Sequence, residues 1–364
     1  MKEFIPKVIY IEPGADEYAY AQNILKKFPD TEKIHIEAFN ENEIELFNSV
    51  KDPITIGKEI LLLRKYKGSF LKKCPGSKGL LCCNYYVINV AMNCHFDCTY
   101  CSLQNYLNTQ AMTLFTNIDD ILNEVNAKIN AYRGRLFRMG TGELADSLAL
   151  DEITELSKIL VPFFADKKNA LLELKTKSNV IKNLKGLRHN QRTVISFSMN
   201  PQSRIDSDEL GTATLKERLE AARTVESWGY KLAFHFDPLV YNDNFEEEYG
   251  EVVKLIFNYV NKENIEWISL GGFRFSKEIA QAVRERFPKS DMLLGEFWLS
   301  DDNKMRYYKK IRKKMYSFMR NEILKYHKKA PVYMCMESKE MWVDVFGYMP
   351  HVEENAEKLF DFRY

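Results

Sequence analysis

The sequence predicts an α/β protein whose centre is a partial barrel of six βα units. Three observations predict this class: six short apolar, β-branched runs recur along the chain, helix-like segments separate most of them, and polar residues follow the runs. Parallel neighbouring strands need long crossovers, because tight turns join only antiparallel strands. A curved sheet of such units is expected to gather functional groups at the carboxyl ends of its strands.

The elements follow in order along the chain. A strand at 8–13, a helix at 15–28 and a strand at 33–39 predict a small N-terminal α/β extension. The barrel strands are predicted at 85–92, 136–140, 171–176, 193–199, 231–237 and 266–272. Apolar residues at helical spacing predict helices at 118–132, 150–164, 215–229 and 246–260. We therefore predict an N-terminal α/β region at 1–84, the barrel at 85–300 and a basic helical and β segment at 301–364.

Composition indicates a soluble globular protein. A chain of 364 residues with 45% hydrophobic and 28% charged residues can bury an ample core. Its first residues lack a charged and then apolar leader, and no apolar run approaches the roughly 18 residues of a spanning helix. Seven cysteines are an odd number, which disfavours a disulfide framework. We expect a reduced, cytoplasmic protein.

A net charge of +1 hides one strongly basic segment. Residues 301–330 hold eleven Lys or Arg against three acidic residues, interleaved with aromatic residues. Such a segment suits a polyanion, because cations neutralise phosphates and bases stack on aromatic rings. A solvated helix face explains the same run, since Tyr308, Ile311 and Met315 follow helical spacing. Both interpretations stay open on charge alone.

Three closely spaced cysteines are the most informative motif. Cys94, Cys98 and Cys101 follow the first predicted barrel strand in the pattern C-x3-C-x2-C, and Tyr100 precedes the last of them. Thiolates hold [4Fe-4S] clusters, usually four at a time, so three suggest a cluster with one iron open to an exchangeable ligand. The motif resembles that of the radical S-adenosylmethionine (SAM) superfamily, in which SAM chelates the open iron. The resemblance implies a (β/α)6 partial barrel.

Zinc binding is the alternative for these cysteines. Cys98 and Cys101 could form half of a zinc site, and Cys74, Cys82 and Cys83 could supply further thiolates. Structural zinc sites normally present two separated pairs of ligands, and the sequence has no second C-x2-C. A zinc-containing nucleic-acid-binding protein is therefore the non-enzyme alternative.

Polar residues after successive strands provide candidates for binding SAM. Gly140 and Gly142 allow close backbone approach, and Thr141 and Glu143 offer oxygens to an ammonium group. A lone histidine in an apolar strand, as at 235, is more often a hydrogen-bonded core residue than a ligand. The full set of candidate cofactor contacts is Tyr100, Gly140, Thr141, Gly142, Glu143, Lys177, Ser198, Asn200 and His235.

Longer stretches resemble the spore photoproduct lyase family, the radical SAM enzymes that split a thymine dimer in DNA. They include KCPGSKGLLCCNYYVIN, MNCHFDCTYCSLQNYLN, GTGELADSLALD, ELKTKS, ISFSMNP, FHFDPLVY, DNKMRYYKKIR and VYMCMES, and they span about residues 70 to 345. The resemblance implies a [4Fe-4S] cluster, SAM and an electron donor such as flavodoxin or ferredoxin. It matches Lys177 and Ser198 to SAM contacts, and Arg306 and Tyr307 to a pair near the lesion. The candidate DNA contacts are Arg306, Tyr307, Lys309, Lys310, Arg312, Lys313 and Lys314.

The sequence departs from the family pattern at two positions. The lyase cysteine that returns a hydrogen atom to the product aligns with Glu143, and a carboxyl group is a poor hydrogen-atom donor. The lyase tyrosine after the third cluster cysteine aligns with Ser102. A neighbouring SAM-contacting serine aligns with Ala145, which leaves Glu143 as a candidate for the SAM ammonium group. Catalytic candidates are Tyr100, Glu143, Tyr307 and Cys335, of which Cys335 or a tyrosine would donate the hydrogen.

Two enzyme hypotheses follow from this resemblance. The first is dimer reversal in damaged DNA by a lyase of this family. The second keeps the cluster and SAM, with another nucleic-acid base or a small molecule as the substrate.

Overall fold

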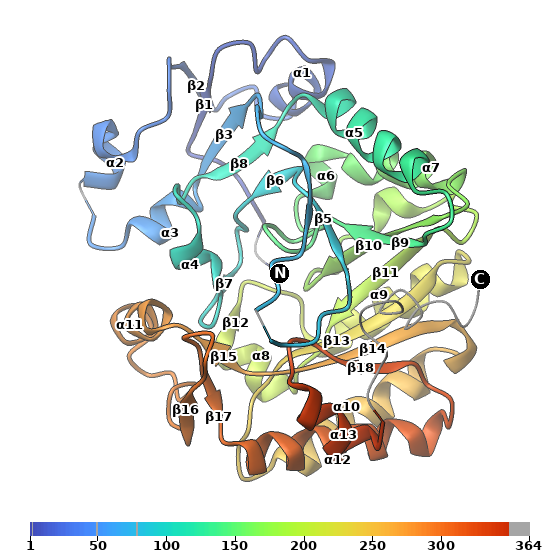
Figure 1. The fold of residues 1–364 in the computed structure, drawn as a ribbon. Coiled ribbons are helices and arrows are strands. Elements are labelled where there is room, and N and C mark those ends of the chain that lie inside the picture. The colour runs from blue at the N-terminus through green and yellow to red at the C-terminus, as the bar shows by residue number, and fades with distance from the viewer. Residues whose placement is uncertain (2, 49, 78, 349–364) are drawn as a thin grey trace.

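Two sheets form the frame of the molecule (Figure 1). The structure is a computed structural model that describes residues 1, 3–48, 50–77 and 79–348. Its larger sheet has eight strands, parallel except for the edge strand β4. In spatial order they are β4 (Leu71–Lys73), β5 (Tyr86–Ile88), β9 (Phe137–Gly140), β10 (Ala170–Thr176), β11 (Thr193–Ser198), β13 (Lys231–Leu239), β14 (Ile265–Gly272) and β18 (Val332–Met334). This curled sheet confirms the predicted fold class, with the edge strands β4 and β18 added to the six predicted strands.

Helices cover the outer face of the larger sheet, and their apolar residues pack on it. α7 contacts β10 and β11, α9 contacts β11 and β13, and α12 contacts β14. The barrel helices are α5 (Ile118–Ala131), α6 (Asp151–Thr154), α7 (Leu156–Ala165), α8 (Gln202–Asp208), α9 (Leu215–Ser227), α10 (Phe245–Tyr259) and α11 (Lys277–Arg286). The predicted helix at 150–164 is divided, because Glu155 has a left-handed backbone (φ 51°). Between β10 and β11 the chain forms only the short 3-10 helix η2 (Lys182–Leu184).

The smaller sheet belongs to the N-terminal part but takes strands from beyond it. Its order is β2 (Glu32–His35), β1 (Val8–Ile11), β3 (Ile60–Arg64), β8 (Met112–Phe115) and β6 (Ala91–Met92). The predicted strand at 85–92 is therefore two strands, β5 in the barrel and β6 in the smaller sheet. The predicted boundary at 84 stays a prediction. The remaining N-terminal elements are α1 (Ala19–Leu25), η1 (Glu41–Glu43), α2 (Glu45–Asn48) and α3 (Pro53–Gly57).

The C-terminal part adds a small antiparallel sheet and two helices below the barrel in Figure 1. Its elements are β15 (Arg274–Phe275), β16 (Phe297–Leu299), β17 (Met305–Tyr307), α12 (Lys309–Tyr326) and α13 (Lys339–Phe346), with η3 (Lys262–Asn264) before β14. No helix among the described residues combines the length and the apolar character needed to cross a membrane.

Candidate functional site

The cysteine motif lies in an irregular loop between β6 and α4 (Leu103–Tyr106), at the carboxyl end of β5. Within it, β7 (Asp97–Cys98) pairs with β12 (Glu209–Leu210) in a two-stranded antiparallel sheet. Thr99 is tied to Asp208 by a backbone hydrogen bond of 2.9 Å and a side-chain hydrogen bond of 2.9 Å. The loop is thus held against the segment that follows β11.

Cys94 and Cys98 lie close enough to Cys101 for its charge to act on their pKa values. Burial, followed by the charges of Asp146 and Cys101, raises the pKa of Cys94 to about 12. Burial also raises the pKa of Cys98, while the nearby Lys177 ammonium acts in the opposite direction. Because ligation requires thiolates, cluster binding has to displace protons from these sites. Three sulfurs on one loop, of which Cys98 is buried and lies near the Lys177 cation, fit a thiolate-bound iron-sulfur cluster.

The described residues contain no group of three His, Cys, Asp or Glu side chains arranged to hold a single metal ion.

Tyr100 is anchored beside the cysteines by a buried polar network. Its hydroxyl donates a hydrogen bond to Glu209, and the Lys177 ammonium lies 5.7 Å from its ring centroid. Glu209 also accepts hydrogen bonds from Arg218 at 2.5 Å and from Asn200 at 2.8 Å. The structure thus brings Tyr100, Lys177 and Asn200 together, as predicted from the strand ends.

Glu209 and Arg218 were missed by the sequence reasoning. Arg218 is fully buried, and its guanidinium also donates to the carbonyl of Ser198 at 2.8 Å. A signal was present in the sequence, because Arg218 lies between Leu215 and Leu219 on the apolar face of its helix. A cation at a core position requires a buried anionic partner.

The segment after β9 lies against both the cysteine loop and β10. Thr141 and Cys94 line one cavity. Asp146 accepts hydrogen bonds from the Lys177 backbone at 2.7 Å and from the Thr176 hydroxyl at 2.6 Å. Its carboxylate therefore fixes the position of the segment that carries Lys177.

Close packing explains both glycines of this segment. A Cβ atom at Gly140 would lie 2.2 Å from the Glu173 carbonyl oxygen, and one at Gly142 would lie 2.8 Å from the Cβ of Lys175. The glycines are needed for the approach of β9 to β10. Whether they also approach a cofactor stays a prediction.

Glu143 forms an ion pair of 2.6 Å with Lys175. Burial opposes the charge of Lys175, but the Glu143 carboxylate more than offsets it and raises the pKa of the ammonium group. The sequence reasoning did not single out Lys175, which provides Glu143 with its counter-ion.

His235 lies inside the barrel in a hydrogen-bonded cluster. Its Nε2 is 2.7 Å from Glu173, which also accepts from Ser196 at 2.6 Å and pairs with Arg138 at 2.6 Å. Burial lowers the pKa of His235 and favours the neutral ring. This environment is that of a satisfied core histidine, and its predicted contact with SAM stays a prediction.

Cys335 follows β18 and lies at the same end of the barrel as Glu143. Its Sγ is 3.9 Å from an Arg274 nitrogen, and Arg274 is paired with Asp237 at 3.0 Å. Burial chiefly, and then the charge of Asp237, raises the pKa of Cys335. The thiol is therefore protonated at neutral pH, which is the form that can donate a hydrogen atom.

The basic segment divides into a buried and an exposed part. Arg306 is 4% exposed and pairs with Asp302 at 2.6 Å, and Tyr307 is 2% exposed and stacks on Phe297 with ring centroids 4.6 Å apart. Arg312 points inward to Glu337 at 3.1 Å. The exposed cations of the predicted set are Lys309, Lys310, Lys313 and Lys314 on α12.

Two of these lysines share one carboxylate, and a third has its own acidic neighbour. Lys309 and Lys313 lie 3.1 and 3.6 Å from Asp344, and Lys314 lies 3.4 Å from Glu246. All these pairs are solvent-exposed on the lysine side, so they are weak.

Comparisons with known proteins agree on one family. A family described as "Spore photoproduct lyase" matches residues 4–341. A spore photoproduct lyase from a Geobacillus strain is 26% identical over 81% of this chain and 86% of its own length. The spore photoproduct lyase of Bacillus subtilis is 24% identical over 94% of this chain and 96% of its own length. A solved structure titled as the lyase complexed with a dinucleoside spore photoproduct superposes with a TM-score of 0.81, at 24% identity, over 92% of this chain and 100% of its own. Since the family match covers nearly all of the described residues, the chain belongs to the spore photoproduct lyase family, whose members are radical SAM enzymes with a [4Fe-4S] cluster.

Proposed function

We propose that the protein repairs thymine-dimer lesions of the spore-photoproduct type in DNA. The observation that carries the proposal is the cysteine loop at the barrel mouth, where Cys94, Cys98 and Cys101 are held next to Lys177 and Tyr100. These cysteines would hold the cluster, which leaves one iron for SAM. A bound cluster and SAM, reduced by a donor such as flavodoxin or ferredoxin, would supply the radical chemistry that removes a hydrogen atom from the substrate.

The chain supplies binding, orientation and protection from water. Lys177 provides a cation for the SAM carboxylate, and Tyr100 provides an aromatic wall for the adenine. Asn200 and Ser198 lie at the end of β11 beside them and offer polar atoms to the ribose. The buried Glu209 and Arg218 keep this group rigid, since each has its charge satisfied by the other.

Cys335 is our candidate for returning the hydrogen atom. Its S–H bond breaks as a C–H bond forms on the substrate radical, which leaves a sulfur-centred radical. A hydrogen atom from 5′-deoxyadenosine would restore the thiol and leave a 5′-deoxyadenosyl radical. The steps would balance without a further oxidant if that radical re-forms SAM with methionine and the oxidised cluster. The thiol is well suited because burial keeps it protonated.

Damaged DNA would meet the protein on the face formed by α12. The four exposed lysines there offer phosphate contacts. Arg306 and Tyr307, which the resemblance matches to a pair near the lesion, are buried behind this face and would need an opening of β16 and β17 to touch a base.

The deciding experiment compares ultraviolet-treated with untreated DNA. Anaerobically reconstituted enzyme is reduced and given SAM, and 5′-deoxyadenosine and repaired thymine are measured. We expect thymine release only with treated DNA. SAM cleavage without any dependence on the lesion would exclude the repair activity.

A second substrate class is favoured by one observation. The Glu143–Lys175 ion pair stands where the resemblance places the hydrogen-donating cysteine of the lyases. A charged pair at that position suits a polar substrate, such as another nucleic-acid base or a small molecule. Lesion-independent SAM cleavage that is stimulated by such a compound would support this alternative.

A further inference from the structure

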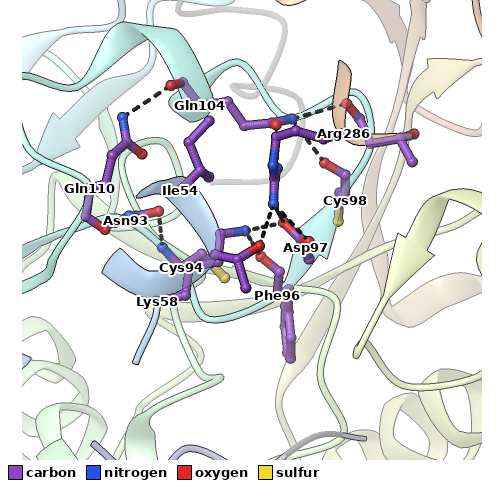
Figure 2. A network of polar contacts seen from close by, with 12 residues as sticks. Ile54, Lys58, Asn93, Cys94, Phe96, Asp97, Cys98, Gln104, Gln110 and Arg286 are labelled. Carbon is purple, nitrogen blue, oxygen red and sulfur yellow. Dashed lines mark hydrogen bonds and ion pairs between the residues drawn. The ribbon is translucent and has the colours of Figure 1, made fainter. Parts of the chain in front are cut away.

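Arg286, the last residue of α11, joins three separate parts of the chain at the cysteine loop (Figure 2). Its Nη2 lies 3.0 Å from both carboxylate oxygens of Asp97, the residue before Cys98. Its Nε lies 2.9 Å from Asp52, at the start of α3. The side chain is only 7% exposed. One guanidinium therefore bridges the barrel, the loop and the N-terminal part.

Lys58 supplies a second cation to the same carboxylate. Its Nζ lies 2.7 Å from Asp97 and donates a hydrogen bond to the carbonyl of Phe96. The Lys58 side chain is 6% exposed, so neither cation of this group is a surface charge. Two buried cations are balanced by two partly exposed carboxylates, as burial of the cations requires.

Amide side chains extend this network to the backbone of the cysteines. Arg286 donates to the Gln104 carbonyl oxygen, and the Gln104 amide donates to the carbonyls of Cys98 at 3.3 Å and Thr99 at 3.0 Å. On the other side of the loop, the Cys94 backbone donates to Asn93 at 2.8 Å. The loop is thus held at Cys94, Phe96, Asp97, Cys98 and Thr99 by groups of the protein itself.

We infer that Arg286 and Lys58 are positioning residues that set the cysteine loop for cluster binding by holding Asp97 between them. This inference rests on the proposed assignment of the three cysteines as cluster ligands. The physical reason is preorganisation: a loop already fixed by the protein loses little entropy when it binds a cluster. The paired charges also set the local potential, because net charge near a cluster tunes its reduction potential.

Two variants test the inference from opposite directions. Arg286→Gln leaves the group with a net negative charge, and Asp97→Asn leaves it with a net positive charge. Both should release iron to a chelator about tenfold faster than the native protein, as expected when the support of a metal ligand is lost. The reduction potential of the cluster should fall in Arg286→Gln and rise in Asp97→Asn. A purely structural role would move both potentials in the same direction or not at all.

A matched control is available in the N-terminal part. Arg64 lies at the end of β3 and pairs with Glu12 through two nitrogens. Arg64→Gln should leave iron release and the reduction potential native. In the protein without a cluster, amide hydrogen exchange over residues 93–106 should accelerate in Arg286→Gln and stay native in Arg64→Gln.

The outcomes separate this inference from the ligand assignment. If Cys98→Ala retains full iron, the cysteines are not cluster ligands. If Cys98→Ala loses iron while Arg286→Gln and Asp97→Asn show native iron release and native potentials, only the inference about positioning fails. If Arg286→Gln does not fold, Arg286→Lys is the substitute, because it keeps the positive charge but loses the several donors of the guanidinium group. Arg286→Lys should release iron faster than the native protein while the reduction potential of the cluster stays nearly native. A native rate of iron release in Arg286→Lys would refute the inference.

Discussion

The carboxylate of Glu143 lies 2.6 Å from the ammonium of Lys175 on the neighbouring strand, at the carboxyl end of the barrel. By resemblance, this is the place of the cysteine that returns hydrogen in the lyases. A carboxylate cannot perform that step efficiently, so the chain must use another donor or another substrate. The ion pair also means that Glu143 has to exchange Lys175 for the SAM ammonium if it binds SAM.

Placing a thiol at this position should increase dimer reversal. We expect Glu143→Cys to raise the yield of repaired thymine per 5′-deoxyadenosine, because it restores a hydrogen donor beside the substrate. Glu143→Gln is the control, since it removes the same charge without adding a thiol. Loss of the partly exposed pair should cost each variant roughly 1 kcal/mol of unfolding free energy or less. An equal yield from both variants would contradict a substrate position next to Glu143.

Removing the thiol of Cys335 should uncouple hydrogen abstraction from product formation. In Cys335→Ala we expect 5′-deoxyadenosine to form while repaired thymine falls by about tenfold or more, because a proposed catalytic group is lost. In D2O the native enzyme should place deuterium from the exchanged thiol into the product. Cys74→Ala, which removes a half-buried thiol next to β4, should behave as the native enzyme. Native product yield from Cys335→Ala would exclude it as donor.

Much of the fold was predictable because its signals are local. The six barrel strands are predominantly apolar runs, and all six predicted positions hold strands of the larger sheet. The division of 85–92 between two sheets was not predictable, since β6 is placed by pairing with β8, some twenty residues further along the chain. Strand pairing over such separations leaves no trace in the periodicity of a single segment.

The site was predictable in its residue types but not in its partners. The expectation that polar groups gather at the carboxyl ends of parallel strands correctly predicted that Lys177, Asn200 and Tyr100 lie together. Glu209, which accepts hydrogen bonds from Tyr100 and Asn200, lies in a two-residue strand that has no periodic signal. The burial of Arg306 and Tyr307 was also missed. A basic run predicts solvent exposure for all its cations, and only the tertiary packing of β17 shows which side chains turn inward.

The exposed lysines of α12 should govern the salt dependence of DNA binding. Replacing Lys309, Lys310, Lys313 and Lys314 with Ala should lower the slope of log K against log salt by up to about 0.9 per lost phosphate contact on duplex DNA. The control replaces four exposed lysines elsewhere, Lys7, Lys26, Lys67 and Lys216. If the slope changes equally in both variants, DNA binding depends on the overall charge of the protein rather than on the exposed lysines of α12.

The turn between β16 and β17 should loosen in acid through Asp302. Burial acts against its charge, but hydrogen bonds from two serines and the charge of Arg306 lower the pKa of Asp302 from 3.8 to about 2. A carboxyl group with a lowered pKa stabilises the fold above its unfolded pKa, and this contribution disappears as the pH falls through the folded value. The stability difference between the native protein and Asp302→Asn should therefore shrink between about pH 4 and pH 2. A difference that is constant over this range in denaturant titrations would contradict the assignment.

The buried pair of Glu209 and Arg218 should be the most sensitive charge pair beside the cysteine loop. Glu209→Gln leaves a fully buried guanidinium without its counter-ion, so we expect a loss of roughly 3–5 kcal/mol of unfolding free energy. The same change turns one of the two acceptor oxygens into an amide donor, so either the Tyr100 hydroxyl or the Arg218 guanidinium loses its acceptor, and the SAM affinity of the reconstituted enzyme should fall as well. The exposed pair of Asp166 and Arg188 gives the comparison, because Asp166→Asn should leave the free energy of unfolding close to that of the native protein. If the two variants lose similar amounts of unfolding free energy, burial does not make the Glu209–Arg218 pair critical for stability. If Glu209→Gln binds SAM with native affinity, this network does not contribute to cofactor binding.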